Sequence, residues 1–339
     1  MGNLNDYLEN LHRKNILLNT SQSDVDKVTS IYPVKISDHI LNRILETNSD
    51  ALARQFFPNP EELEDTTGVG AFFPDEKHAS KTLVQKYPNR CIIYTTSSCF
   101  ANCRHCSRKE KWKEQYTFSR VEFDEAYLKI KDASFFEEVI LTGGDMLTID
   151  DESIDYVLNK ITSISHVKVV RIGTRAFTSY PKRISSKLCT ILSKYKSVVI
   201  LTQFNHPDEF SEDTINAIQM VQKTGTPILN QAVLLKDIND RYSVIKELLT
   251  KCAENRVIPY YLFHCFKVKG VQCFRPDVKV GIKIMQNLVG NVGGWWIPRY
   301  ILIPHTTGLK IPVCPNGIVE ETNGALLVKD YTDRICKYE

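Results

Sequence analysis

The chain has 339 residues, of which 42% are hydrophobic and 24% are charged. This composition is typical of a globular protein and excludes a disordered, collagen-like or coiled-coil chain. Lysine and arginine (43 residues) nearly balance aspartate and glutamate (40 residues), so the charge does not favour a function that depends on neutralising nucleic-acid phosphates.

The sequence indicates a soluble, cytoplasmic protein. No segment approaches about 18 uninterrupted apolar residues, and residues 1–6 lack the features of a secretory signal. We therefore expect neither a membrane nor a nucleic acid as a partner. Ten cysteines in such a chain indicate metal, redox or catalytic use rather than a disulfide framework.

The pattern of the chain divides it into three regions. Residues 1–85 are helical and then irregular, and we expect them to form an N-terminal helical cap. Residues 86–290 alternate short apolar runs with longer amphipathic segments, which is typical of repeated βα units and a parallel sheet. Residues 291–339 are β-rich and predict a short C-terminal extension.

Six strands and several helices are predicted in the middle region. The strands cover residues 91–96, 138–142, 167–172, 198–204, 228–235 and 258–266. Helix-length segments cover residues 151–163, 211–224, 240–255 and 278–290. Six βα units in a row predict an α/β fold with a partial (β/α)6 barrel that is similar to a TIM barrel. Because barrel enzymes carry their chemistry at the carboxyl ends of the strands, we expect functional residues directly after each strand.

Three cysteines follow the first predicted strand. Cys99, Cys103 and Cys106 have the spacing Cys-x3-Cys-x2-Cys, and thiolates at this spacing suit an iron–sulfur cluster or zinc. No fourth cysteine lies nearby, and His105 is poorly placed to bind a metal together with the adjacent Cys106. Three ligands leave one metal position open for a small molecule. A structural zinc site is the alternative interpretation.

This spacing resembles the signature of radical S-adenosylmethionine enzymes, in which three cysteines hold a [4Fe-4S] cluster and S-adenosylmethionine binds the fourth iron. The resemblance implies that the reduced cluster generates a 5′-deoxyadenosyl radical, which removes hydrogen from an unactivated carbon. After the second predicted strand, Gly143, Gly144 and Asp145 are similar to the glycine-rich element of this family that contacts the amino group of the cofactor.

More of the chain resembles the lysine 2,3-aminomutase family, which combines this radical with pyridoxal 5′-phosphate. The similarity runs from about Tyr87 to the C-terminus, and several of its segments follow predicted strands. The matched segments include residues 87–90, 104–108, 141–145, 171–175, 204–207, 230–235, 259–261 and 310–313. The resemblance implies an isomerase that converts an α-amino acid into a β-amino acid.

The resemblance also implies roles for individual residues. Lys310 matches the catalytic lysine that carries pyridoxal phosphate, and Arg108 matches the arginine that binds the α-carboxylate of the substrate. Lys86 and Arg90 match positions that hold the phosphate group, where cationic donors suit a dianion. Tyr87 matches a residue that packs on the pyridine ring.

Two further residues, Arg175 and Gln231, lie in matched segments and are expected to contact the cofactors. The partners that the resemblance implies are a small-molecule amino acid substrate and a flavodoxin- or ferredoxin-type reductant. Self-association, as in other family members, is a further expectation.

The match fails at the pocket for the substrate side chain. Lysine aminomutases bind the distal ammonium of lysine with two aspartates, because a buried cation needs paired anions. The matched positions here are Phe266 and Ile303. The sequence therefore predicts an amino acid other than lysine, with an apolar or uncharged side chain. Alternatively, Arg299 and His305, which share the strand parity of Ile303, could meet an acidic or polar side chain.

Two other functions are compatible with the sequence. One is a radical enzyme with the same cofactors but another outcome, such as elimination, oxidation, hydroxylation or modification of a lysine within a protein. The other is a non-catalytic iron–sulfur protein, which would have no need for Lys310, Arg108 and the Gly143-Gly144-Asp145 element together.

Overall fold

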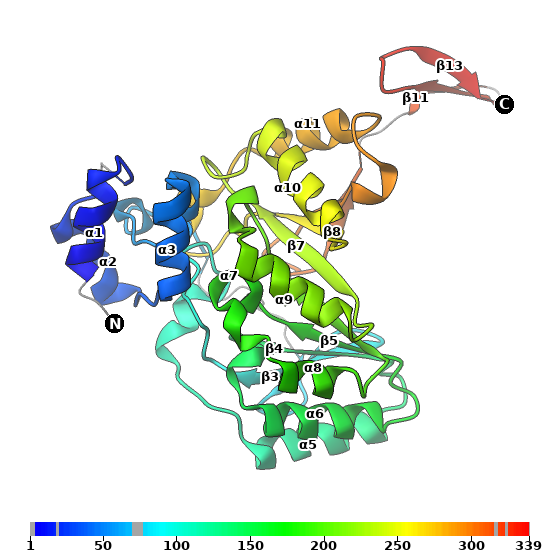
Figure 1. Cartoon of the computed structure of the whole chain (residues 1–339). Coiled ribbons are helices and arrows are strands. Elements are labelled where there is room, and N and C mark those ends of the chain that lie inside the picture. Colours follow the sequence, from blue (N-terminus) through cyan, green and yellow to red (C-terminus); the bar gives the residue numbers. More distant parts are fainter. Residues whose placement is uncertain (1–3, 18–19, 70–76, 315–317, 323–324, 339) are drawn as a thin grey trace.

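The centre of the molecule is a ten-stranded sheet in which the strands follow one another in sequence order from β1 to β10 (Figure 1). The computed structural model describes residues 4–17, 20–69, 77–314, 318–322 and 325–338. The strands of the sheet are β1 Lys77–His78, β2 Leu83–Tyr87, β3 Arg90–Thr96, β4 Glu138–Gly143, β5 Val169–Gly173, β6 Val198–Thr202, β7 Ile228–Leu234, β8 Ile258–His264, β9 Arg299–Leu302 and β10 Ile311–Val313.

Strands β3 to β9 run parallel, and β2 and β10 flank them in antiparallel pairing. All six predicted strands are confirmed, with ends that differ by about two residues. Among the described residues, the two edges of the sheet do not pair with each other, so the partial barrel is open. The sheet extends beyond residues 86–290 on both sides, because it includes β1, β2, β9 and β10.

Helices cover the outer face of the sheet (Figure 1). They are α5 Arg120–Asp132, α6 Asp151–Thr162, α7 Ala176–Ser179, α8 Ser186–Leu192, α9 Glu212–Gln222, α10 Tyr242–Glu254 and α11 Val278–Leu288. Side-chain oxygens accept hydrogen bonds at the start of several of them, as Asp150 does for α6 and Ser211 for α9. Short 3₁₀ helices complete the connections: η1 Pro60–Glu62, η2 Lys109–Lys113, η3 Met146–Thr148, η4 Pro181–Arg183, η5 Pro207–Glu209, η6 Gln272–Phe274 and η7 Gly294–Trp296.

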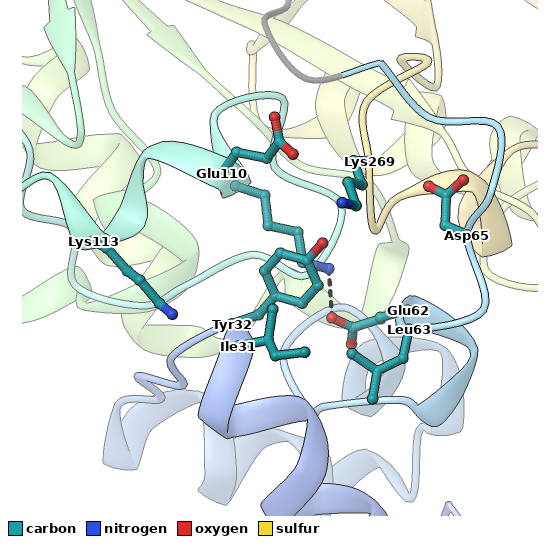
Figure 2. A pocket seen from close by; sticks show the side chains of 9 residues that line it. Ile31, Tyr32, Glu62, Leu63, Asp65, Glu110, Lys113 and Lys269 are labelled. Carbon is teal, nitrogen blue, oxygen red and sulfur yellow. Dashed lines mark hydrogen bonds and ion pairs between the residues drawn. The ribbon is translucent and has the colours of Figure 1, made fainter.

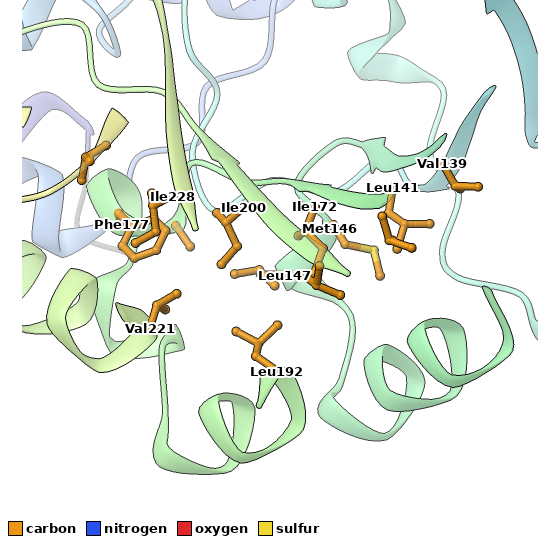
Figure 3. Close-up of a cluster of buried hydrophobic side chains, with 14 of the residues drawn as sticks. Val139, Leu141, Met146, Leu147, Ile172, Phe177, Leu192, Ile200, Val221 and Ile228 are labelled. Carbon is orange, nitrogen blue, oxygen red and sulfur yellow. The ribbon is translucent and has the colours of Figure 1, made fainter. Parts of the chain in front are cut away.

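The main apolar core lies between the helices and the sheet (Figure 3). Alternate residues of the strands, such as Leu141 in β4, Ile172 in β5 and Ile200 in β6, are fully buried against the helices. Because successive side chains of a strand point to opposite faces, the residues between them face the interior of the barrel. The interior positions of β4 and β5 include the charged residues Glu138 and Arg171.

An N-terminal cap of four helices packs beside the barrel (Figure 1). The helices are α1 Leu4–Arg13, α2 Gln22–Ile31, α3 Asp38–Thr47 and α4 Asp50–Arg54. Their apolar cluster, which includes Ile44, Phe56 and Phe57, also contains Ala101 and contacts Cys103. The predicted helical cap is therefore in direct contact with the loop that carries the three cysteines.

A second, three-stranded antiparallel sheet lies near the C-terminus, at the far end of the molecule from the cap (Figure 1). Its strands are β11 Ile318–Thr322, β12 Ala325–Lys329 and β13 Ile335–Tyr338. The β-rich character predicted for this region is confirmed. Within the described part of the chain, no helix has the length and apolar composition needed to cross a membrane.

Candidate active site

Two glycines at the end of β4 hold the start of the cysteine loop. The backbone N–H of Gly144 donates to the carbonyl of Thr96 (2.5 Å), and that of Asp145 donates to the carbonyl of Ser98 (2.7 Å). A Cβ on Gly144 would overlap the Ser98 carbonyl, and Gly143 has a φ of +132°. Only glycine allows this close approach, so the pair fixes where the cysteine loop leaves β3.

The carboxylate of Asp145 joins the ends of β4 and β5. It accepts hydrogen bonds from the backbone N–H of Leu147 (2.9 Å), the hydroxyl of Thr174 (2.8 Å) and the backbone N–H of Arg175 (2.7 Å). Burial raises the pKa of this carboxyl above its ordinary value, although the hydrogen bonds from Arg175 and Thr174 oppose the shift. Asp145 therefore orders the loops around the site, and its expected contact with a cofactor stays a prediction.

The three cysteines share one site on the loop after β3. Burial raises the pKa of the Cys99 thiol well above its ordinary value, and the neighbouring groups Asp145, Cys106 and Cys103 raise it further. The thiols are thus close enough to influence one another. Because a bound metal removes the proton from a coordinating thiol, this half-buried set of cysteines suits a metal centre.

The described residues fit an iron–sulfur cluster better than a single metal ion. Among them, no group of three histidine, cysteine or carboxylate side chains could hold one ion. In a cluster each cysteine binds a different iron, so its sulfurs stand further apart. Two of the sulfurs accept N–H donors, Cys106 from the backbone of Arg108 (3.3 Å) and Cys103 from Nη1 of Arg175 (2.8 Å). Such hydrogen bonds are typical of cluster-binding thiolates.

His105, the alternative fourth ligand, has other partners. Its ring is buried, and Nε2 lies 3.0 Å from Nε2 of Gln203 and 3.2 Å from Nδ2 of Asn205. Because both neighbours are amide donors, this nitrogen acts as the acceptor. His105 therefore anchors the cysteine loop to the segment that follows β6.

A second group of predicted residues converges at Lys310, immediately before β10. The Lys310 ammonium nitrogen lies 5.3 Å from the centre of the Tyr87 ring, and the Lys310 backbone N–H donates to the Tyr87 hydroxyl (3.0 Å). The Arg90 guanidinium lies over the same ring, 4.5 Å from its centre. Lys86 lies beside Tyr87 on β2. The fold thus brings a lysine near the C-terminus to cations and an aromatic ring from the first strands.

The environment of Lys310 favours a neutral amine. Burial lowers the pKa of Lys310 to about 8, the charges of Arg171 and Arg90 lower it further, and Glu138 opposes the shift. A neutral amine is the form that attacks a carbonyl, so this lysine suits covalent attachment of an aldehyde cofactor.

Arginines near Lys310 suit an anionic group. Arg90 lies 3.8 Å from the Glu138 carboxylate, and Arg171 pairs with the same carboxylate. Two guanidinium groups on one carboxylate leave an excess of positive charge. Nε of Arg90 is buried and has no hydrogen-bond partner among the described residues, which leaves a donor for a phosphate. The residues present therefore fit pyridoxal phosphate.

Sequence reasoning missed Arg171 and Glu138 as parts of this site. The available signal is a charged residue inside an otherwise apolar strand, as in the run Val169-Val170-Arg171-Ile172. A charge at an interior barrel position needs a partner, and here Glu138 and Arg171 provide one for each other.

Arg108 lies next to the cysteine loop. Its guanidinium lies 4.0 Å from the centre of the Tyr94 ring, a cation–π contact, and it has no ion pair with a described residue. A half-buried guanidinium of this kind suits a carboxylate, and the role of Arg108 in binding the substrate carboxylate stays a prediction.

The two predicted side-chain pocket residues lie on one apolar surface. Phe266 and Ile303 are half-buried and pack against the same cluster, and the rings of Phe263 and Phe266 are 5.9 Å apart. The cluster consists of Val233, Leu235, Ile238, Phe263, Cys265, Val268, Val271, Phe274 and Ile301. Three of them, Val233 in β7, Phe263 in β8 and Ile301 in β9, alternate with residues of the main core and therefore lie on the face opposite the helices, which is the barrel interior. The other six follow the ends of β7 and β8.

The remaining predicted residues lie away from this surface or have no described polar contact. Arg299 is exposed at the beginning of β9, opposite Tyr261, whereas Ile303 follows the end of that strand. His305 is half-buried in the connection between β9 and β10. Gln231 is half-buried in β7, next to an irregularity in the pairing with β8.

A cavity of about 400 Å³ lies outside this site, between the cap and η2 (Figure 2). It contains none of the predicted site residues. Its wall includes Glu62, which is fully buried and accepts charged hydrogen bonds from Arg104 and Lys109. Nζ of Lys109 also donates to the Arg104 carbonyl (3.0 Å) and the Gly270 carbonyl (2.6 Å). This network was not predicted from the sequence. It fixes the cysteine loop through Arg104, which lies between Cys103 and Cys106.

Comparison with known proteins gives close relatives over most of the chain, whereas no family model matches it. The L-lysine 2,3-aminomutase of Methanococcus maripaludis is 33% identical over 322 residues, which cover 94% of this chain and 74% of that protein. The L-lysine 2,3-aminomutase of Clostridium subterminale is 34% identical, over 76% of this chain and 62% of that protein. The glutamate 2,3-aminomutase of Clostridioides difficile is 33% identical, over 82% of this chain and 66% of that protein.

Proposed function

The chain belongs to the lysine 2,3-aminomutase family of radical S-adenosylmethionine isomerases, and from this premise we propose that it converts an α-amino acid with an apolar side chain into the corresponding β-amino acid. The cofactors are those of the family: a [4Fe-4S] cluster, S-adenosylmethionine and pyridoxal 5′-phosphate. One observation carries the choice of substrate. Phe266 and Ile303, which we expect to face the substrate side chain, are both apolar, half-buried and packed on one hydrophobic cluster.

The residues of the site divide the work of binding and positioning. Cys99, Cys103 and Cys106 would hold the cluster, and Arg108 would bind the α-carboxylate of the substrate. Lys310 would hold pyridoxal phosphate, since burial keeps a large fraction of its amine neutral near pH 8. When bound, the cofactors supply a radical that removes hydrogen from the β-carbon and a conjugated system through which nitrogen moves between adjacent carbons.

The cation site would receive the phosphate group. Arg90 offers a buried N–H without a partner among the described residues, and Arg171 adds a second guanidinium at the shared carboxylate of Glu138. Tyr87 would cover one face of the pyridine ring of the cofactor, because the Lys310 nitrogen that would hold the cofactor lies over the Tyr87 ring. Gly143, Gly144, Lys86 and Gln231 stay predicted cofactor contacts.

An apolar pocket discriminates against charged side chains. A lysine ammonium placed against Phe266 and Ile303 would lose its hydration without gaining an anion, at a cost of several kcal/mol. A glutamate carboxylate would need a cation, and Arg299 is exposed at the opposite end of β9. The exposure of Arg299 leaves only the half-buried His305 of the two residues predicted to meet an acidic side chain, which supports the apolar substrate.

A product assay tests this proposal. Protein reconstituted without oxygen with iron, sulfide and pyridoxal phosphate is incubated with S-adenosylmethionine, dithionite and one amino acid at a time, and β-amino acids are quantified by mass spectrometry. We expect product from leucine, isoleucine, valine, methionine or phenylalanine, and for lysine a kcat/KM roughly 100-fold lower, about 2.7 kcal/mol. Lysine or glutamate as the best substrate would contradict the proposal.

The same assay separates the alternatives. Cleavage of S-adenosylmethionine without any β-amino product would favour another outcome, such as elimination or oxidation. A Lys310→Ala protein with a full cluster is the control for pyridoxal-dependent product. A flavodoxin- or ferredoxin-type reductant and self-association stay predictions.

A further inference from the structure

Arg175 contacts a cluster cysteine directly. It follows β5 and is 8% exposed, and its Nη1 donates to Sγ of Cys103 at 2.8 Å. Its other donors are also used: Nε donates to the Gln203 carbonyl (3.2 Å), and Nη2 donates to Oε1 of Gln55 (2.6 Å) and to Glu209 (3.2 Å). The guanidinium is therefore held in one orientation, with one edge against sulfur.

The carboxylate of Glu209, which holds Arg175, also accepts hydrogen bonds from other residues. Glu209 is buried and accepts from the Thr178 hydroxyl (2.8 Å), the Asn205 backbone (2.9 Å) and the Gln55 amide (3.1 Å). The Glu209 carboxylate pairs with the guanidinium and so balances the buried arginine charge. The pair thus places a positive charge against the sulfur without leaving a buried ion uncompensated.

The cap contributes to this arrangement. Gln55 follows α4 in the cap, and its backbone carbonyl accepts from the N–H of Arg104, between Cys103 and Cys106. Its side chain meanwhile bonds Arg175 and Glu209. One residue of the cap therefore fixes both the cysteine loop and the arginine that donates to it.

We propose that Arg175 is a positioning residue that raises the reduction potential of the cluster through its charged N–H···S hydrogen bond to Cys103, and that Glu209 and Gln55 hold it for this purpose. A hydrogen bond to a ligand sulfur and a nearby positive charge both stabilise the reduced cluster, which is one electron more negative. The resemblance implied only that Arg175 contacts a cofactor. This inference does not depend on which amino acid is the substrate.

A redox titration of the reconstituted protein tests the proposal. The fraction of reduced cluster is measured by electron paramagnetic resonance at a series of solution potentials, without substrate, in the parent and in Arg175→Gln. We expect the ratio of reduced to oxidised cluster to fall about tenfold at a fixed potential, which is about 59 mV for a one-electron couple. Iron analysis confirms equal loading of both proteins.

Arg43→Gln is the matched control. Arg43 also bridges cap and barrel, donating to the carbonyls of Asp208 (2.6 Å) and Phe210 (3.3 Å), but it has no contact with sulfur. Its removal should leave the potential at the parent value.

Arg175→Lys separates the hydrogen bond from the charge. Lysine keeps the positive charge, but its ammonium cannot donate to Cys103, Gln55 and Glu209 at once as the guanidinium does. We therefore expect the reduction potential of this variant also to lie below that of the parent. The proposal would be overturned if either variant, at full iron loading, had the same reduction potential as the parent. Loss of the cluster from both variants would assign Arg175 to holding the loop and would equally overturn it.

Discussion

Burial and two nearby arginines set the protonation state of Lys310. Its pKa lies at about 8, so the amine is half neutral at that pH. We expect its reaction with an amine-specific reagent in cofactor-free protein to rise with pH and to level off above about pH 9. Peptide mass spectrometry over a pH series measures this profile, with exposed Lys187 in the same sample as the control. If the reactivity of Lys310 kept rising above about pH 9 in parallel with that of Lys187, the lowered pKa of Lys310 would be contradicted.

The substrate pocket can be tested by restoring its anions. Phe266→Asp together with Ile303→Asp introduces two carboxylates where the half-buried apolar side chains now lie. We expect lysine to bind at least about tenfold more tightly, roughly 1.4 kcal/mol, because its ammonium would gain partners. Calorimetric titration with lysine measures the change.

The matched control for this pair is Phe266→Leu with Ile303→Leu, which keeps the surface apolar and should not bind lysine more tightly. A folded double aspartate variant with unchanged lysine binding would show that these residues do not line the side-chain pocket.

At the scale of elements, the approach of β4 to the cysteine loop depends on a missing side chain. In Gly144→Ala the new Cβ would overlap the carbonyl of Ser98, so the loop must move. We expect the variant to fold but to retain well under half of the parent's iron after reconstitution. Gly294→Ala is the control, because nothing lies within 4 Å of the Cβ added there. Equal iron content in all three proteins would rule out this role for Gly144.

The buried ion network behind the loop connects the cap with the barrel. Glu62→Ala would leave Arg104 and Lys109 buried without their shared carboxylate, so we expect a loss of about 3–5 kcal/mol in the free energy of unfolding. Urea unfolding measures the loss. Glu61→Ala, at the exposed neighbouring position, should change stability by less than about 0.5 kcal/mol. Similar effects of the two substitutions would show that the network adds no stability.

Some elements could be read from the sequence because their signal is local. The six predicted strands are continuous apolar runs, and the cysteine spacing needs only eight residues, 99–106. The sequence predicts residues 299–302 as part of the extension, whereas they form β9 of the barrel sheet; the strand has only four residues and follows a turn-rich segment, so its signal is weak.

Contacts between distant segments left no such signal. Gln55 and Glu209 are 154 positions apart, and the bond between Lys310 and Tyr87 spans 223 positions. In the sequence, nothing distinguishes Glu62 from the other acidic residues of its segment, whereas in the structure it pairs with Arg104 and Lys109. The sequence therefore supplied the chemistry of the site, whereas the residues that orient it required the structure.

At the scale of the whole molecule, the open barrel brings two kinds of chemistry to one interior. The cysteine loop follows β3 and is fixed by β4, β5 and the cap, whereas Lys310 lies between β9 and β10 at the other edge of the sheet. Tyr87 and Arg90, beside the first edge, contact or approach Lys310 across the opening. If the predicted roles of the cysteines and Lys310 are correct, the open sheet places the radical source and the pyridoxal phosphate at one barrel interior.

The central claim is that one barrel carries both cofactors. Trapping pyridoxal phosphate on the protein tests this claim most directly. Protein reconstituted with a full cluster is treated with pyridoxal phosphate, reduced with borohydride and digested, and the modified peptides are mapped by mass spectrometry. We expect one dominant pyridoxyl adduct, on Lys310, and its absence from Lys310→Ala. If excess pyridoxal phosphate gives no adduct on Lys310, or an equal one on exposed lysines, nitrogen migration at this site is contradicted.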